Sequence, residues 1–100
     1  MQTLGERVEQ VAAETEKNRY VYIRTDLEAC FTVADIVNTE STYGDRKRAR
    51  QALAIAQDGL DTAQRFLRDL KDEELRKELE AKAAALSERL NSLERTHNLP

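Results

Sequence analysis

The chain has 100 residues, and 53 of them are Ala, Glu, Lys, Leu or Arg, which is the composition of long α-helices. Three Gly and one Pro are too few turn residues for a β-sandwich, a barrel or a glycine-rich nucleotide-binding fold. The net charge of −3 gives no overall attraction to nucleic acid or to an anionic membrane, so we expect neither as a partner. Length and composition therefore predict a single all-α domain over residues 1–100.

The sequence also carries signals about its cellular setting. Its single Cys cannot form an internal disulfide, and the first twenty residues are amphipathic, without the apolar core of a signal peptide. No apolar run approaches the roughly 18 residues that span a bilayer. We therefore expect a soluble protein in a reducing, cytoplasmic compartment.

The first predicted helix covers residues 3–40, which contain no Pro and one Gly. Two apolar stripes follow it at helical spacing. One stripe consists of Tyr20, Ile23, Leu27, Cys30, Phe31, Ala34 and Val37. The other keeps a seven-residue repeat over most of its length and consists of Leu4, Val8, Val11, Thr15, Asn18, Tyr22, Thr25, Ala29, Val33 and Ile36. Together the stripes cover more of the helix than two neighbouring helices can bury.

The second stripe is therefore a candidate surface for self-association. Soluble monomers rarely leave such a stripe open, whereas a two-fold dimer buries it. We expect a homodimer whose interface contains the apolar members of the stripe, namely Leu4, Val8, Val11, Tyr22, Ala29, Val33 and Ile36. The polar members would restrict the register of the two copies.

A break in the first helix near residues 17–25 is the rival interpretation. Thr25 and Glu28 have capping-box spacing, and the segment 20–23 is β-branched and aromatic, which favours extended chain. A broken helix would fold its first part back as a fourth helix and cover its own stripe.

The second predicted helix covers residues 45–70, and Gly44 and Asp45 suit the end of one helix and the N-cap of the next. Its first turn carries a basic cluster, which opposes the helix dipole and consists of Arg46, Lys47, Arg48 and Arg50. Carboxylates and negative dipole ends of neighbouring helices would balance this charge in an antiparallel bundle. We expect such internal matching rather than a nucleic-acid site, because no aromatic residue beyond Tyr43 accompanies the cluster.

The third predicted helix covers residues 72–96, with Asp72 as its N-cap. Its short connection to the preceding helix makes the two antiparallel neighbours. The expected fold is thus an antiparallel three-helix bundle with a long first helix, or a four-helix bundle if the first helix breaks. Its core is expected to hold Leu53, Leu60, Leu67, Leu79, Leu86 and Leu90 together with Phe31 and Phe66.

The connection between the first and second predicted helices resembles part of a known family. The spacing of Gly44, Asp45, Ala49, Leu53 and Ala56 resembles the second half of a tetratricopeptide repeat, in which small residues let two helices nest. Long antiparallel helices with this turn are also similar to the three-helix microtubule-interacting-and-trafficking module. The resemblance covers about thirty residues and implies an adaptor that binds a peptide or a helix in a groove.

Few residues could carry chemistry. Glu94 and His97 have the spacing of two metal ligands on one helix face, but a di-iron bundle needs two such pairs. Cys30 lies on an apolar stripe, as a buried and inert thiol would. We therefore expect no catalytic residue, no cofactor and no metal within one chain.

These observations together predict a non-catalytic protein–protein interaction module. It would self-associate through its first helix and present a groove to an unidentified protein partner. The alternative is a regulatory helical bundle that binds a ligand or a metal at the interface between two subunits.

Overall fold

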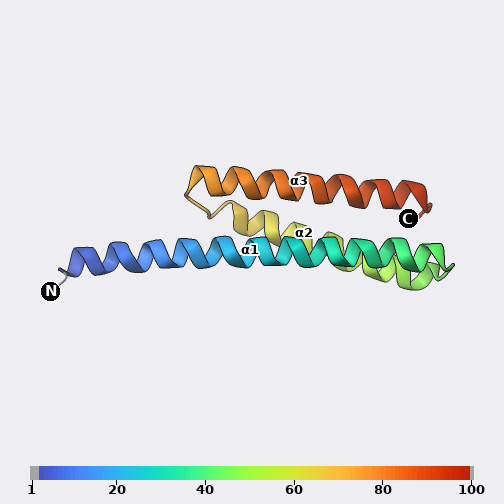
Figure 1. The fold of residues 1–100 in the computed structure, drawn as a ribbon, viewed down its shortest axis with the longest axis horizontal. Coiled ribbons are helices and arrows are strands. Elements are labelled where there is room, and N and C mark those ends of the chain that lie inside the picture. The colour runs from blue at the N-terminus through green and yellow to red at the C-terminus, as the bar shows by residue number, and fades with distance from the viewer. Residues whose placement is uncertain (1–2, 100) are drawn as a thin grey trace.

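The computed structural model describes residues 3–99, apart from the side chains of residue 9 and residues 11–13. Within these residues it contains three α-helices and no strand: α1 (Leu4–Thr42), α2 (Arg46–Leu67) and α3 (Glu73–Thr96). The predicted all-α class is confirmed. α2 runs back along α1, α3 returns in the direction of α1, and each helix packs against the other two (Figure 1).

α1 is one uninterrupted helix of 39 residues, so the alternative break near residues 17–25 is wrong. Ile23 and Leu27 are both fully buried, and this anchors the helix to the core throughout that region. The capping box that forms lies at the other end of the helix. There the Thr3 hydroxyl accepts from the backbone N–H of Glu6, and the Glu6 carboxylate accepts from that of Thr3.

The turn between α1 and α2 has the geometry of a Schellman motif. The backbone N–H groups of Gly44 and Asp45 donate to the carbonyls of Ser41 and Glu40, at 3.1 and 2.9 Å. Gly44 has a φ of 83°, a left-handed conformation that strains any residue with a side chain. The Asp45 carboxylate then caps α2 by accepting from the N–H of Arg48. Both residues thus have the roles expected from the sequence.

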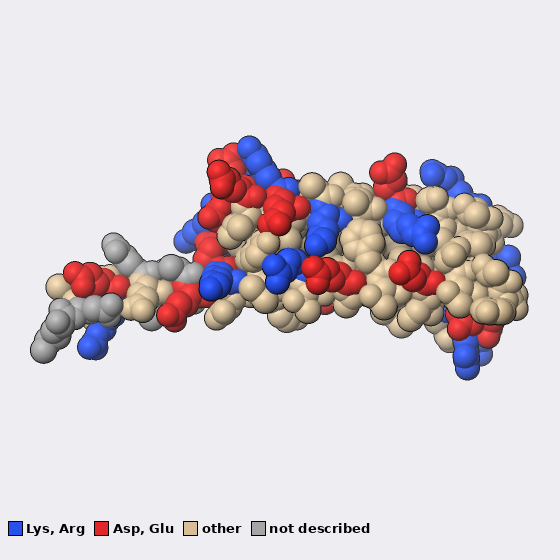
Figure 2. All heavy atoms as spheres, viewed as in Figure 1, with Lys and Arg blue, Asp and Glu red and all other residues tan. Residues whose placement is uncertain are grey.

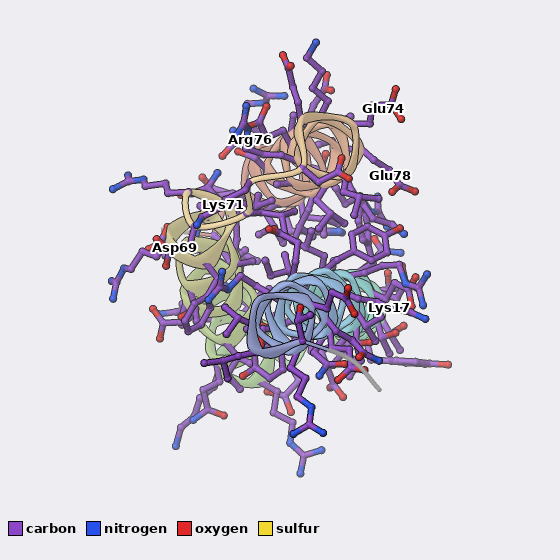
Figure 3. The ribbon with its side chains drawn as sticks, turned by 90° about the vertical axis from the view of Figure 1, so that its left-hand side faces the viewer. Lys17, Asp69, Lys71, Glu74, Arg76 and Glu78 are labelled. Atoms are coloured by element: carbon purple, nitrogen blue, oxygen red, sulfur yellow. The ribbon has the colours of Figure 1, made fainter. Side chains whose placement is uncertain are left out.

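The turn between α2 and α3 is held against α1 by hydrogen bonds. The Glu16 carboxylate accepts from the backbone N–H of Lys71 at 2.7 Å, and Arg19 donates to the carbonyl of Asp69 at 3.1 Å. α2 ends at Leu67, three residues before the expected end, because Leu70 turns into the core. Viewed along α1, Asp69 and Lys71 lie on one side of that helix and Lys17 lies on the other (Figure 3).

Residues 4–15 of α1 project beyond the other two helices, and we call this segment the arm (Figure 1). Its length is about 18 Å at the rise of an α-helix. The arm gives the molecule extents of 63 × 19 × 15 Å. The space-filling view shows the arm as a narrow extension of a thicker body (Figure 2).

The core lies between the three helices and follows the predicted faces closely. All six leucines expected there are buried. Phe31 packs against the core while partly exposed. The placement of Phe66 in the core is wrong: 40% of this residue is exposed, because it lies at the edge of the buried face rather than at its centre. Gly59 lets α2 approach α1 closely, since a Cβ at this position would overlap the sulfur of Cys30.

Candidate self-association surface

The arm presents apolar side chains to solvent. Leu4 is 79% exposed and Val8 is 60% exposed. Both lie on the helix before the point where the turn after α2 meets α1. The side chain of Val11, the third apolar residue expected on this part of the stripe, lies outside the described part of the structure. The arm therefore carries at least two large apolar groups that the other helices leave uncovered.

The stripe continues from the arm onto the body of the molecule beside α2. Tyr22 and Phe66 pack edge to face there, with ring centroids 5.9 Å apart and planes at 89°. Further along α1, Ala29 and Ile36 are exposed, whereas Val33 is half-buried against the core. Of the predicted interface residues, Val33 thus contributes in part to the chain's own core.

An apolar residue of α2 that the sequence did not single out extends this surface. Ile55 is 62% exposed. α2 runs antiparallel to α1, and Gly59 of α2 faces Cys30 of α1. Ile55 lies one turn before Gly59, so it lies beside the turn of α1 that follows Cys30 and carries Val33 and Ile36. We call this apolar surface the α1–α2 seam: Tyr22, Ala29, Val33 and Ile36 of α1 with Ile55 and Phe66 of α2.

The opposite flank of α1, next to α3, is bridged by polar contacts. The contacts from α3 to α1 join Glu78 to Tyr20 at 2.6 Å, Lys82 to Glu28 at 3.2 Å and Arg89 to Asp35 at 3.7 Å. The hydrogen bond to Glu78 raises the pKa of Tyr20 above its ordinary value, and loss of solvent adds to the rise. Acidic and basic side chains mix on the face that Figure 2 shows. The flank of α1 beside α2 instead carries the exposed apolar side chains of the seam.

The basic cluster at the start of α2 is partly matched within the chain. Arg46 donates to the carbonyls of His97 and Asn98, at 3.2 and 2.7 Å, where α3 ends. These carbonyls form the negative end of the α3 dipole, so the contact is favourable. Arg48 pairs with Asp45 at 3.6 Å.

His97 has a structural environment at the same end of the molecule. Its Nε2 lies 2.9 Å from Oδ1 of Asn38 on α1, and its backbone caps α3. In the described part of the chain, which leaves out the side chains of residues 9 and 11–13, no group of three or more His, Cys, Asp or Glu side chains is placed to hold a metal ion. No helix in that part of the chain is long and apolar enough to cross a membrane.

A shallow groove runs between α2 and α3 on the surface. It holds one cavity of about 440 Å³, whose lining includes Gln64, Arg68, Glu80 and Ala84, and one of about 360 Å³, whose lining includes Asp58, Asp61, Ser87 and Asn91. Polar and charged side chains line much of both cavities.

Cys30 is buried, and its thiol should react slowly. Burial raises the pKa of this thiol, and the charge of Asp26 adds to the rise, so little thiolate forms near neutral pH. We expect alkylation by iodoacetamide at pH 8 to be at least about 100-fold slower in the folded chain than in urea. An exposed thiol in the double variant Lys17→Cys, Cys30→Ala serves as the control and should react rapidly in both states. Equal rates for native Cys30 in the two states would contradict the buried position.

Comparison with known proteins gives no match, since no family model, no curated protein and no solved structure is significantly similar to this chain.

Proposed function

We propose that this chain is a non-catalytic interaction module that forms a homodimer through α1. The observation that carries the proposal is the arm, whose Leu4 and Val8 side chains are largely exposed, continued by the α1–α2 seam. Exposed apolar residues scattered singly are ordinary, but apolar residues that recur along one stripe of a helix, here with Thr15, Asn18 and Thr25 between them, are typical of an interface. The free energy for association would come from removing this stripe from water.

Light scattering after size-exclusion chromatography tests the dimer directly. At about 10–100 μM we expect a mass of twice 11.4 kDa. The variant Val8→Asp, Tyr22→Glu places charges in the stripe at two exposed positions, so it should remain helical but elute as a monomer.

A matched control keeps the charge change and moves it off the stripe. Lys17→Gln, Lys47→Gln lowers the net charge by the same two units at exposed positions, and it should stay dimeric. Circular dichroism confirms that each variant is folded. A monomeric native protein at 100 μM, or equal dissociation of both variants, would count against the proposal.

The same proposal includes a second surface for an unidentified protein partner. The groove between α2 and α3 would accept a peptide or a helix, as the resemblance to tetratricopeptide and microtubule-interacting-and-trafficking modules implies. A metal held between two subunits is less well supported, because His97, the one His in the sequence, is hydrogen-bonded to Asn38. Stoichiometric Fe, Mn or Zn in the purified dimer, lost on His97→Ala, would favour the metal instead.

A further inference from the structure

We infer that the two copies pair antiparallel, with the arm of each α1 lying along the α1–α2 seam of the other copy. This inference rests on the proposed self-association and adds its orientation, its register and the contribution of α2. The arm is then a fourth helix on the body of its partner.

The order of residue types along the stripe is compatible with antiparallel pairing in one register. When α1 is laid against a reversed copy of itself with residue 20 at the centre, Leu4 faces the partner's Ile36. In the same register Thr15 faces the partner's Thr25, and Asn18 faces the partner's Tyr22. Leu4 and Ile36 thus meet at each end of the overlap, and the polar residues Thr15, Asn18 and Thr25 lie near its middle. Polar residues in a helical seam restrict its register, whereas the choice of the antiparallel orientation rests on the dimensions of the arm and on Ile55.

The dimensions of the arm and the seam also agree. The α1 part of the seam extends from Tyr22 to Ile36, which is about 21 Å of helix, and the arm is about 18 Å long. In this register the two copies of α1 overlap over residues 4–36, about 48 Å. A strip of that length and about one helix diameter in width, some 10 Å, covers about 480 Å² per copy, so contacts with α2 must add to it to reach the scale of about 800 Å² per partner found in stable interfaces.

The flanks of the stripe favour the same arrangement. The flank next to α3 carries Asp35, which pairs with Arg89 at 3.7 Å, so it offers the arm no apolar neighbour. On the other flank the arm approaches the partner's Ile55, the exposed apolar residue that α2 adds to the seam. A parallel pair would lay arm against arm and Ile36 against the partner's Ile36, so the arm would not reach Ile55 of the partner. Antiparallel pairing thus adds Ile55 to the apolar surface that the arm covers.

Cross-linking of two differently tagged chains in a Cys30→Ala background tests the orientation. One chain carries Leu4→Cys and the other carries Ile36→Cys, and both substitutions are at exposed positions that the fold does not require. We expect mild oxidation to give the mixed disulfide as the main product. Leu4→Cys mixed with Ala29→Cys is the control, because those thiols would be about 10 Å apart along the helix and should cross-link poorly.

A second measurement tests the contribution of α2 without cysteines. Ile55→Asp should raise the dissociation constant of the dimer by about tenfold or more, whereas Ala54→Asp, at the neighbouring exposed position off the seam, should change it by less than about twofold. A dimer by light scattering in which Leu4→Cys links to itself, or in which Ile55→Asp and Ala54→Asp behave alike, overturns the antiparallel arrangement and leaves self-association standing. A native protein that is monomeric at 100 μM overturns both.

Discussion

We expect Leu86→Ala to lower the free energy of unfolding by about 2–5 kcal/mol. Leu86 lies in the middle of α3 and has 0% of its surface exposed, so truncation leaves a cavity that the surrounding helices cannot fully close. A domain of this size has a total stability of about 5–15 kcal/mol, so the loss is a large fraction of it. Urea unfolding followed by circular dichroism measures the change, provided that the protein concentration is held constant.

Leu75→Ala is the graded control for this prediction. Leu75 lies in the first turn of α3 and is only partly buried, so the same truncation should cost about 1 kcal/mol. If the two substitutions had equal effects, the helical phase assigned to α3 would be incorrect.

Gly59→Ala should destabilise the chain by about 1–3 kcal/mol, although Ala is the better helix former by about 1 kcal/mol. The added Cβ would overlap the sulfur of Cys30, and this sulfur is itself buried, with little room to move. α1 and α2 would have to separate locally, which weakens the packing on both sides of the contact. Thermal and urea unfolding of the two proteins measure the net effect.

A double-mutant cycle isolates this contact from other effects of the substitution. Cys30→Ala removes the sulfur, so Gly59→Ala should be tolerated in that background or should stabilise the helix. The coupling free energy between the two positions should exceed about 1 kcal/mol. Gly59→Ala that stabilises the native chain would show that the helices are further apart than the structure places them.

The helices and their faces could be predicted because they follow from local spacing. The three expected helices, residues 3–40, 45–70 and 72–96, agree with the structure to within three residues at each end. Apolar spacing also identified the buried leucines. It failed for Phe66, because periodicity locates the centre of a buried face but not its edges. Phe66 lies at such an edge, against Tyr22.

Contacts between helices could not be predicted in the same way, since they depend on the offset of one helix against another. Ile55 is an isolated apolar residue in the sequence, and it joins the seam only once Gly59 and Cys30 set the register of α2 on α1. The bond from Tyr20 to Glu78 and the bonds from Arg46 to the end of α3 likewise require that offset. The exposure of Leu4 was expected because helices of 22 and 24 residues cannot cover one of 39.

The unequal lengths of the helices also divide α1 into two units of different stability. Between Ile23 and Val37 the helix is held by buried side chains, so its backbone amides exchange with solvent only when the whole body unfolds. Isolated helices shorter than about 12–15 residues are marginal in water, and the arm extends from the body with Leu4 and Val8 in solvent. Its amides can open locally while the rest of α1 stays intact. We therefore expect a single continuous helix to behave as two cooperative segments, of which the outer one gains hydrogen-exchange protection only from what it binds.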